Sequence, residues 1–190
     1  VDSDFRMIPD VLEEQLDLAQ AQGRHGLAVV AVIGSTEEGS VDPLDKVLAL
    51  REARERKGRG SFWVHGDGAY GGYLRSITVP RRIGLGDAMS TVRLGGRRHD
   101  ITLDLPAEGA CEALEAMAGC DSVTIDPHKL GYVPYPSGAI CFRSPTVRLV
   151  TKQIAPYIED SSSEPAQDRR SETIGMYALE GSRPGAAAAA

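Results

Sequence analysis

The stretch 121-DSVTIDPHKL-130 contains the residues that decide how this chain folds and what it binds. Val123 and Ile125 alternate with polar residues, which is typical of a short β-strand. An Asp-Pro pair then ends the strand and begins a turn. Lys129 therefore follows a strand end, the position where α/β folds bind their ligands. The alternative is an ordinary solvated loop lysine, and the rest of the sequence must decide between the two.

The composition is that of a soluble globular protein, with 42% hydrophobic and 25% charged residues among 190. This length is enough for one domain with a sizeable core. A net charge of -6 argues against a nucleic-acid partner and against binding to an anionic membrane. Since no run of about 18 apolar residues occurs, a membrane-spanning helix is not predicted.

The cysteines and histidines do not form a metal motif. Cys111, Cys120 and Cys141 lack the close-paired spacing of a zinc or redox site. The four histidines are scattered, without a His-x-x-x-His pair. We therefore expect no metal, and reduced thiols in a cytoplasmic protein.

Helix and strand patterns alternate along the chain, which predicts an α/β fold with a parallel or mixed sheet covered by helices. Helices are expected at 10–22, 42–58 and 107–119, and strands at 26–34, 61–67, in the opening stretch and at 138–143. The last of these strands is expected to pair with the strand of the opening stretch.

Details of these elements extend the prediction. The continuous apolar run 26–34 is typical of a strand buried on both faces. Asp42 is expected to be the N-cap of the second helix, with Pro43 at its first position. Residues 77–101 show little periodicity and suggest a surface insertion or loop, and the polar stretch 159–172 suggests a mobile loop.

Two other strand ends also carry unusual residues. The first is followed by 34-GSTEEGSVD-42, whose Ser35 and Thr36 offer hydroxyls, although it is not a phosphate loop of the Gly-x-x-x-x-Gly-Lys type. The second is 65-HGDGAYGG-72, where glycines around Asp67 allow the backbone to approach a ligand closely. The alternative for this motif is a glycine-rich turn with a capping aspartate.

An aspartate and a lysine at neighbouring strand ends match the needs of pyridoxal phosphate. The cofactor's aldehyde forms an imine with a lysine, and an aspartate keeps its pyridine nitrogen protonated so that the ring accepts electrons. Such a lysine must be partly desolvated or lie near positive charge, because either lowers the pKa of its amine.

At this point several motifs together resemble one family. The chain is similar to the group II pyridoxal-phosphate-dependent amino-acid decarboxylases of fold type I, and most similar to the bacterial tyrosine decarboxylases. The matching motifs, in the family's order, are 1-VDSDFRM-7, 29-VVAVIGSTEEGSVDPLDKV-47, 64-VHGDGAYGGYLRS-76, 121-DSVTIDPHKLGYVPYPSGAI-140 and 177-YALEGSRPGA-186. The resemblance implies a mixed, mostly parallel sheet with helices on both faces.

The resemblance also implies roles for individual residues of the cofactor site. Lys129 is implied to form the imine with the cofactor, and Asp67 to pair with the pyridinium nitrogen. Ala69 is implied to pack against the ring, with Thr36 and His128 lining the pocket.

Two tyrosines are implied as proton donors. Tyr157 lies where the family places a catalytic-loop tyrosine that protonates the substrate's α-carbon after carbon dioxide leaves. Tyr135 is the second candidate. For both, the alternative is packing in the core or an interface.

Some features depart from the family. Gly66 and Gly68 flank Asp67 where the family usually has valine and alanine, which suggests looser packing against the ring. Family enzymes are much longer, so we expect residues 1–190 to be part of the cofactor-binding large domain, without the N-terminal segment that bears the ring-stacking histidine and without the C-terminal small domain. The final 185-GAAAAA-190 is then the start of a helix, or alternatively a tag.

The implied function is pyridoxal-phosphate-dependent decarboxylation of an L-amino acid, with a tyrosine-like substrate favoured. The implied partners are the amino-acid substrate and either a second copy in a homodimer or a complementary chain that completes the active site. The alternatives are a partial-length or split-enzyme subunit with a structural role and no activity alone and, less favoured, an aminotransferase-type enzyme of fold type I.

Overall fold

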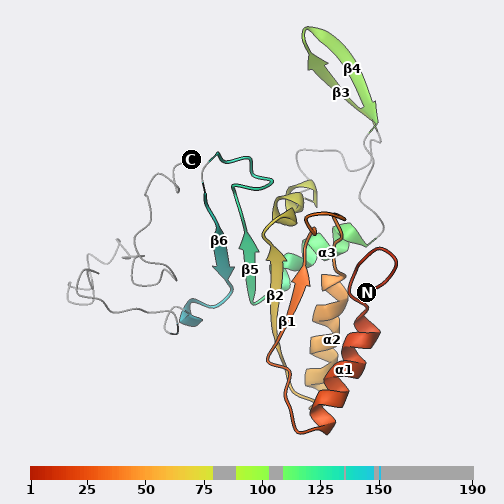
Figure 1. Ribbon diagram of the computed structural model, residues 1–190, viewed down its shortest axis with the longest axis vertical. Coiled ribbons are helices and arrows are strands. Elements are labelled where there is room, and N and C mark those ends of the chain that lie inside the picture. The colour runs from red at the N-terminus through yellow and green to blue at the C-terminus, as the bar shows by residue number, and fades with distance from the viewer. Residues whose placement is uncertain (79–88, 103–108, 135, 148–149, 151–190) are drawn as a thin grey trace, which may run out of the picture.

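The computed structural model describes residues 1–78, 89–102, 109–134, 136–147 and 150. Its main sheet has four strands in the order β1-β2-β5-β6 (Figure 1). The first three pair in parallel, and β6 runs antiparallel to β5. The strands are β1 (Ala28–Val32), β2 (Trp63–Gly68), β5 (Ser122–Ile125) and β6 (Ala139–Phe142). The predicted mixed, mostly parallel sheet is therefore confirmed, including the pairing of its last two strands.

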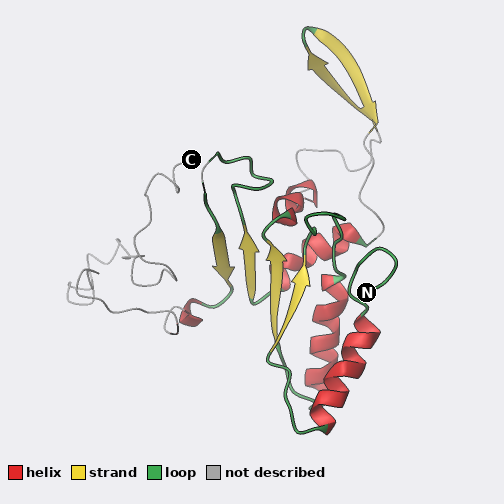
Figure 2. Cartoon of the chain, in the orientation of Figure 1, coloured by secondary structure: helices red, strands yellow, loops and turns green. Residues whose placement is uncertain are grey.

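Three α-helices accompany this sheet (Figure 2). They are α1 (Pro9–Ala21), α2 (Leu44–Arg56) and α3 (Ala110–Ala116), and short 3₁₀ turns occur at Gly71–Thr78, Met117–Gly119 and Pro145–Val147. Side chains of α2 and α3 pack against alternate residues of β1 and β2 in one cluster: Val29, Ala31, Ile33, Leu44, Val47, Phe62, Val64, Ala113, Leu114, Met117 and Cys120. The hydrophobic core thus lies on one face of the sheet.

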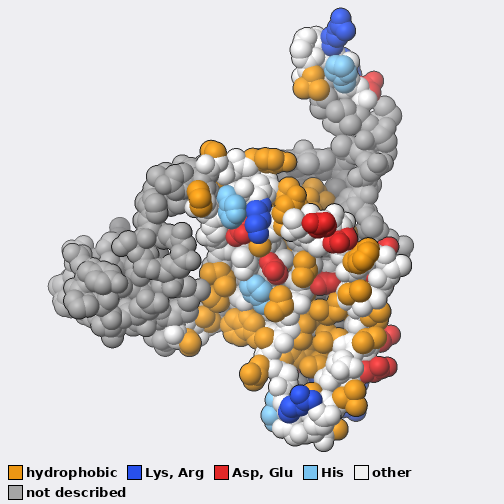
Figure 3. Space-filling model, viewed as in Figure 1, with side chains coloured by type: hydrophobic (Ala, Val, Ile, Leu, Met, Phe, Trp, Pro, Cys, Tyr) orange, Lys and Arg blue, Asp and Glu red, His pale blue; other side chains and the backbone are white. Residues whose placement is uncertain are grey.

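The opposite face of the sheet is open among the described residues. Val29 and Ala31 are buried, whereas Val30 is 50% exposed and Val32 is 37% exposed. Figure 3 shows hydrophobic side chains at the surface over the strands. Burial of β1 on both faces was therefore the wrong expectation for the described part of the chain, because its helices supply only one of the two layers that this fold class has.

Asp42 does not cap α2, which corrects another expectation. The helix begins at Leu44, and its N-cap position is Pro43, with no side-chain cap. The buried Asp42 carboxylate instead accepts hydrogen bonds from the backbone N–H groups of Val32 (2.7 Å) and Met7 (2.6 Å). Asp42 therefore joins the outer edge of β1 to the segment before α1.

Part of the stretch 77–101 forms a β-hairpin rather than an irregular loop. Strands β3 (Met89–Leu94) and β4 (Arg97–Thr102) pair antiparallel through Gly95-Gly96 and project away from the main sheet (Figure 1). Both glycines have positive φ, as a two-residue hairpin turn requires. The Gly95-Gly96 pair is the local sequence signal for this hairpin, and hydrophobic periodicity does not detect it. The loop expected at 159–172 and the terminal alanine run lie outside the described residues.

No helix in the described ranges is long and apolar enough to cross a membrane. The same residues contain no group of three or more His, Cys, Asp or Glu side chains arranged to hold a metal ion.

An ion pair between a buried arginine and an exposed aspartate connects the two long helices. Arg54 of α2 is only 4% exposed, and its guanidinium donates to Asp17 Oδ1 (2.6 Å) and Gln20 Oε1 (3.0 Å) on α1. These contacts satisfy the charge that Arg54 buries, which is costly when unpaired. The hydrogen bond from Arg54 is also the main reason why the pKa of the Asp17 carboxyl is lowered.

Replacing Arg54 is therefore expected to loosen α1 from α2. Arg54→Ala should lower the free energy of unfolding by about 2–3 kcal/mol, because a buried side chain and two hydrogen bonds are lost. Arg56→Ala is the matched control, since Arg56 is exposed, and it should change stability by less than about 0.5 kcal/mol. Urea denaturation followed by circular dichroism measures both. Equal effects of the two variants would contradict the role given to Arg54.

The cysteines should differ sharply in reactivity. Cys120 is buried, and burial raises the pKa of its thiol to about 11, whereas Cys141 is exposed. Because the thiolate is the reactive form, Cys141 should react quickly with a disulfide reagent at pH 8 and Cys120 only after unfolding. Labelling kinetics before and after adding denaturant, with Cys120→Ser to identify its signal, measure this difference. Fast labelling of Cys120 in the folded protein would refute the packing described here.

Candidate functional site

Three loops meet at one edge of the sheet. Because β1, β2 and β5 are parallel, the segments that begin at Gly34, Ala69 and Asp126 all follow carboxyl ends of neighbouring strands. The N–H of Ile33 donates to the carbonyl of Asp67 (2.8 Å), and the N–H of Asp126 donates to the carbonyl of Ala69 (3.2 Å). The structure thus holds the Asp67 and Lys129 segments next to each other.

The approach of the second loop to the first depends on Gly71. A Cβ atom built on Gly71 would lie 2.7 Å from Gly34 Cα and would also collide with the carbonyl of Ile33. Only a residue without a side chain fits there. Gly71 therefore sets the spacing between the loop after β1 and the loop after β2.

Asp67 is half-buried near the end of β2. Its Oδ1 accepts a hydrogen bond from the N–H of Ala69 (3.1 Å). Strand alternation puts Gly66 and Gly68 on the other face, where a Cβ on Gly66 would lie 3.3 Å from the Cys120 sulfur. The departures from the family at these two positions therefore affect packing on the core side of β2, whereas the Asp67 side chain is on the opposite face.

Lys129 lies in the turn after β5 and is held by a carboxylate. Its Nζ is 2.9 Å from Asp126 Oδ2, with the two side chains 35% and 16% exposed. The turn itself is closed by the N–H of Lys129, which donates to the carbonyl of Asp126 (3.0 Å). The amine is neither freely solvated, as in the ordinary alternative, nor buried, and remains accessible to a reactant at the sheet edge.

The other predicted site residues differ in how the structure places them. His128 is exposed, and its Nδ1 forms a hydrogen bond with the carbonyl of Ser137, the segment that leads into β6. Thr36 is exposed in the loop after β1. Tyr135 and Tyr157 lie outside the described residues, so their roles remain predictions.

A cluster around His65, which belongs to the same glycine-rich motif as Asp67, lies outside the predicted set of site residues. His65 Nδ1 lies 2.7 Å from Ser122 Oγ, and His65 Nε2 lies 3.1 Å from Thr124 Oγ1. The indole N–H of Trp63 also donates to Ser122 Oγ (2.8 Å). The period-2 spacing of residues 63, 65 and 67 was the available signal, because such residues share one face of a strand.

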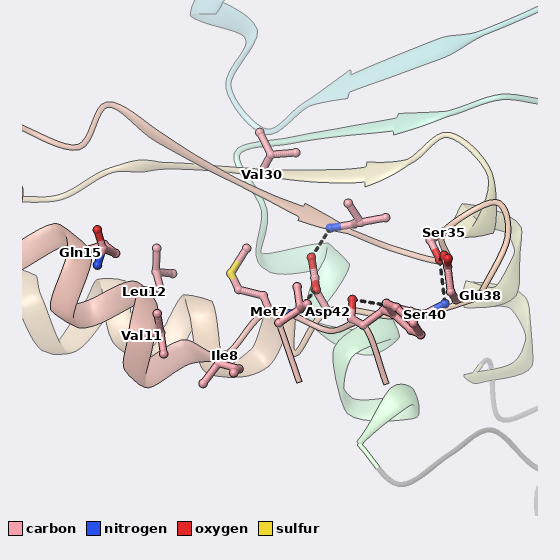
Figure 4. A pocket seen from close by; sticks show the side chains of 13 residues that line it. Met7, Ile8, Val11, Leu12, Gln15, Val30, Ser35, Glu38, Ser40 and Asp42 are labelled. Carbon is pink, nitrogen blue, oxygen red and sulfur yellow. Dashed lines mark hydrogen bonds between the residues drawn. The ribbon is translucent and has the colours of Figure 1, made fainter. Parts of the chain in front are cut away.

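A pocket among the described residues lies elsewhere, beside β1 and the start of α1 (Figure 4). Its volume is about 460 Å³, and its lining is mostly apolar but includes Asp42 and Glu38. Figure 4 shows Asp42 linking the strand to the segment that holds Met7. Neither Lys129 nor Asp67 lines this pocket, so its position does not mark the predicted site.

The fold shows which class of protein the chain is similar to. It matches part of the pyridoxal-phosphate-dependent decarboxylases of fold type I. The structure of mouse CSAD in its apo form is 25% identical with a TM-score of 0.56, and the match covers 96% of this chain and 30% of that one. Tryptophan decarboxylase from Catharanthus roseus, solved with L-tryptophan, is 17% identical with a TM-score of 0.58, over 95% of this chain and 28% of that one, and supports the fold alone.

The more specific similarity is to bacterial L-tyrosine decarboxylases. The enzyme of Enterococcus faecium is 38% identical and that of Levilactobacillus brevis 35%, each over 100% of this chain and 30% of the relative. Aspartate 1-decarboxylase of Aliivibrio fischeri is 31% identical over 98% of this chain and 26% of the relative. The resemblance inferred from the motifs is thus confirmed, and the chain spans about 30% of the length of these tyrosine decarboxylases. No family model matches the chain.

The close contact at Gly71 gives a stability prediction. Gly71→Ala should lower the free energy of unfolding by about 2 kcal/mol or more, because the new methyl group meets rigid backbone. Gly66→Ala is the control, since its methyl group would meet a side chain at 3.3 Å, and should cost less than about 1 kcal/mol. Denaturant titration of both variants measures the difference. A Gly71→Ala variant as stable as Gly66→Ala would show that the close contact between the loops after β1 and β2 does not require a glycine at position 71.

Proposed function

We propose that residues 1–190 belong to a pyridoxal-phosphate-dependent carboxy-lyase that converts an L-amino acid, with a tyrosine-like substrate favoured, into its amine and carbon dioxide. The observation that carries this proposal is the position of Asp67 and Lys129 on adjacent parallel strand ends, in a chain similar along its whole length to L-tyrosine decarboxylases. The similarity to an aspartate 1-decarboxylase keeps the substrate open to other amino acids.

The described residues have the chemistry that the cofactor needs. Asp67 is half-buried and uses Oδ1 for the N–H of Ala69, so a carboxylate has acceptor capacity left for a pyridinium N–H. Lys129 offers a partly exposed amine at the same sheet edge. When bound, pyridoxal phosphate supplies a ring that accepts the electron pair of the breaking carbon–carbon bond.

Asp126 forms an ion pair with the amine of Lys129. Asp126 Oδ2 lies 2.9 Å from Lys129 Nζ, so this ion pair engages the amine that would form the imine with the cofactor. Lys129 would therefore have to leave this ion pair before it could hold the cofactor. The remaining contacts proposed from the family are Ala69 against the ring face, and Thr36 and His128 in the pocket wall.

We propose Tyr157 as the group that returns a proton to the substrate's α-carbon, with Tyr135 as the second candidate. A tyrosine hydroxyl is a suitable general acid once it is placed within hydrogen-bond reach of that carbon. Substitution of each tyrosine by phenylalanine removes the proton and keeps the ring, which separates a donor from a packing residue.

We further propose that residues 1–190 form part of the cofactor-binding large domain, in a cytoplasmic dimer or in an assembly with a complementary chain. Two observations support this: the match covers about 30% of the relatives' length, and one apolar face of the sheet is open among the described residues. The same observations favour a second candidate, a split-enzyme subunit that has a structural role and no activity alone.

Trapping the cofactor on Lys129 tests the proposal. The purified protein, with any partner chain it carries, should absorb visible light after incubation with pyridoxal phosphate, and borohydride should fix the cofactor to Lys129, as read by peptide mass spectrometry. Lys129→Ala should abolish trapping and amine formation. Lys46→Ala, at an exposed helix position, should leave both unchanged. Trapping without amine release from any amino acid would favour the structural subunit, and absence of trapping in the wild-type protein would refute cofactor binding at this lysine.

A further inference from the structure

The turn that carries Lys129 contains a backbone conformation that needs support. The N–H of Lys129 donates to the carbonyl of Asp126 (3.0 Å), and the N–H of Val133 donates to the carbonyl of Pro127 (3.1 Å). Within this turn Tyr132 has a φ of 55°, in the left-handed region that favours glycine. Such a residue keeps its conformation only where the surrounding structure holds it. The turn therefore depends on contacts from outside itself.

The ring of Tyr73 supplies one such contact, at Gly131. A Cβ atom built on Gly131 would lie 2.8 Å from Cζ and 2.9 Å from Cε2 of Tyr73, and 2.5 Å from the carbonyl oxygen of Pro127. Only a residue without a side chain fits between the ring and this carbonyl. Gly131 directly precedes Tyr132, so the ring packs next to the strained residue of the turn.

The backbone that carries Tyr73 is held against the end of β5. A Cβ atom on Gly72 would lie 3.0 Å from a side-chain carbon of Ile125, and one on Gly68 would lie 2.9 Å from Gly72 Cα. Tyr73 follows Gly72 directly, in the 3₁₀ segment that comes after β2. Its ring therefore approaches the turn from the segment that follows Asp67.

We propose that Tyr73 is a positioning residue for Lys129: its ring packs on Gly131 and fixes the turn that carries the amine at a set place relative to Asp67. The consequence for catalysis rests on the proposed function, whereas the packing of the turn does not. The Tyr73 atoms that make the contact are the ring carbons Cζ and Cε2. Phenylalanine should therefore replace this tyrosine, and a small side chain should not.

Amide hydrogen exchange measures the turn without any cofactor. In Tyr73→Ala the N–H groups of Lys129 and Val133 should exchange about tenfold faster than in the wild-type protein, because the turn opens more often. Tyr73→Phe should leave both rates unchanged. Phe5→Ala is the matched control, since it removes an aromatic ring that is 60% exposed and lies in the segment before α1.

The catalytic consequence is measured in the protein with any partner chain it carries. Tyr73→Ala should lower kcat for amine formation about tenfold with KM nearly unchanged, and should slow borohydride trapping on Lys129, because the amine is less well placed. Tyr73→Phe and Phe5→Ala should keep the wild-type kcat. If Tyr73→Ala fails to fold, as measured by circular dichroism, Tyr73→Leu takes its place and should show a smaller loss in the same direction.

Three results would overturn the positioning role. The first is a Tyr73→Ala variant with wild-type exchange and kcat, and the second is faster exchange with kcat unchanged, which leaves only a structural contact. The third is a Tyr73→Phe variant as impaired as Tyr73→Ala, because the effect would then belong to the hydroxyl. If the wild-type protein fails to trap cofactor on Lys129, the proposed function fails, and hydrogen exchange alone decides whether the ring fixes the turn.

Discussion

The parallel pairing of β1, β2 and β5 is the constraint on which the candidate site depends. Parallel strands bring their carboxyl ends to one edge, so Asp67, near the end of β2, and Lys129, in the turn after β5, reach the same edge although they are far apart in the sequence. The register then decides which side chains adjoin: Asp67 pairs with Thr124, and His65 with Ser122. A shift of one residue would turn Asp67 toward the core side and remove it from this edge.

The helices contribute to the site indirectly, by stabilising only one face of the sheet. Core residues such as Leu44 and Leu114 pack against the side of β1 and β2 that carries Val29 and Val64. Asp67 and the cluster around His65 are on the other side, where Val30 and Ile140 are exposed among the described residues. Polar groups on that side are thus close to both solvent and exposed apolar side chains.

Much of the architecture could be predicted because it follows from local patterns. The alternation of helical and strand periodicities gave the element order, and a terminal glycine at position 23 marked the end of α1. Asp42 could not be predicted in the same way. Its local context is that of a helix cap, yet its carboxylate binds backbone N–H groups of residues 7 and 32, and contacts over such separations are invisible to a local pattern.

The sequence by itself determined the chemistry of the chain: an aspartate in a glycine-rich strand end, a lysine behind a second strand end, and the motifs that tie both to amino-acid decarboxylases. Residue types and spacing suffice for this, because strand ends and turns are local properties of the chain. Only the tertiary structure decided that Lys129 pairs with Asp126 and that Gly71 sets the loop spacing. It also decided that His65 of β2 forms a hydrogen bond with Thr124 of the neighbouring strand β5. These depend on register and on distances of a few ångströms between separate segments, which spacing along one chain does not determine.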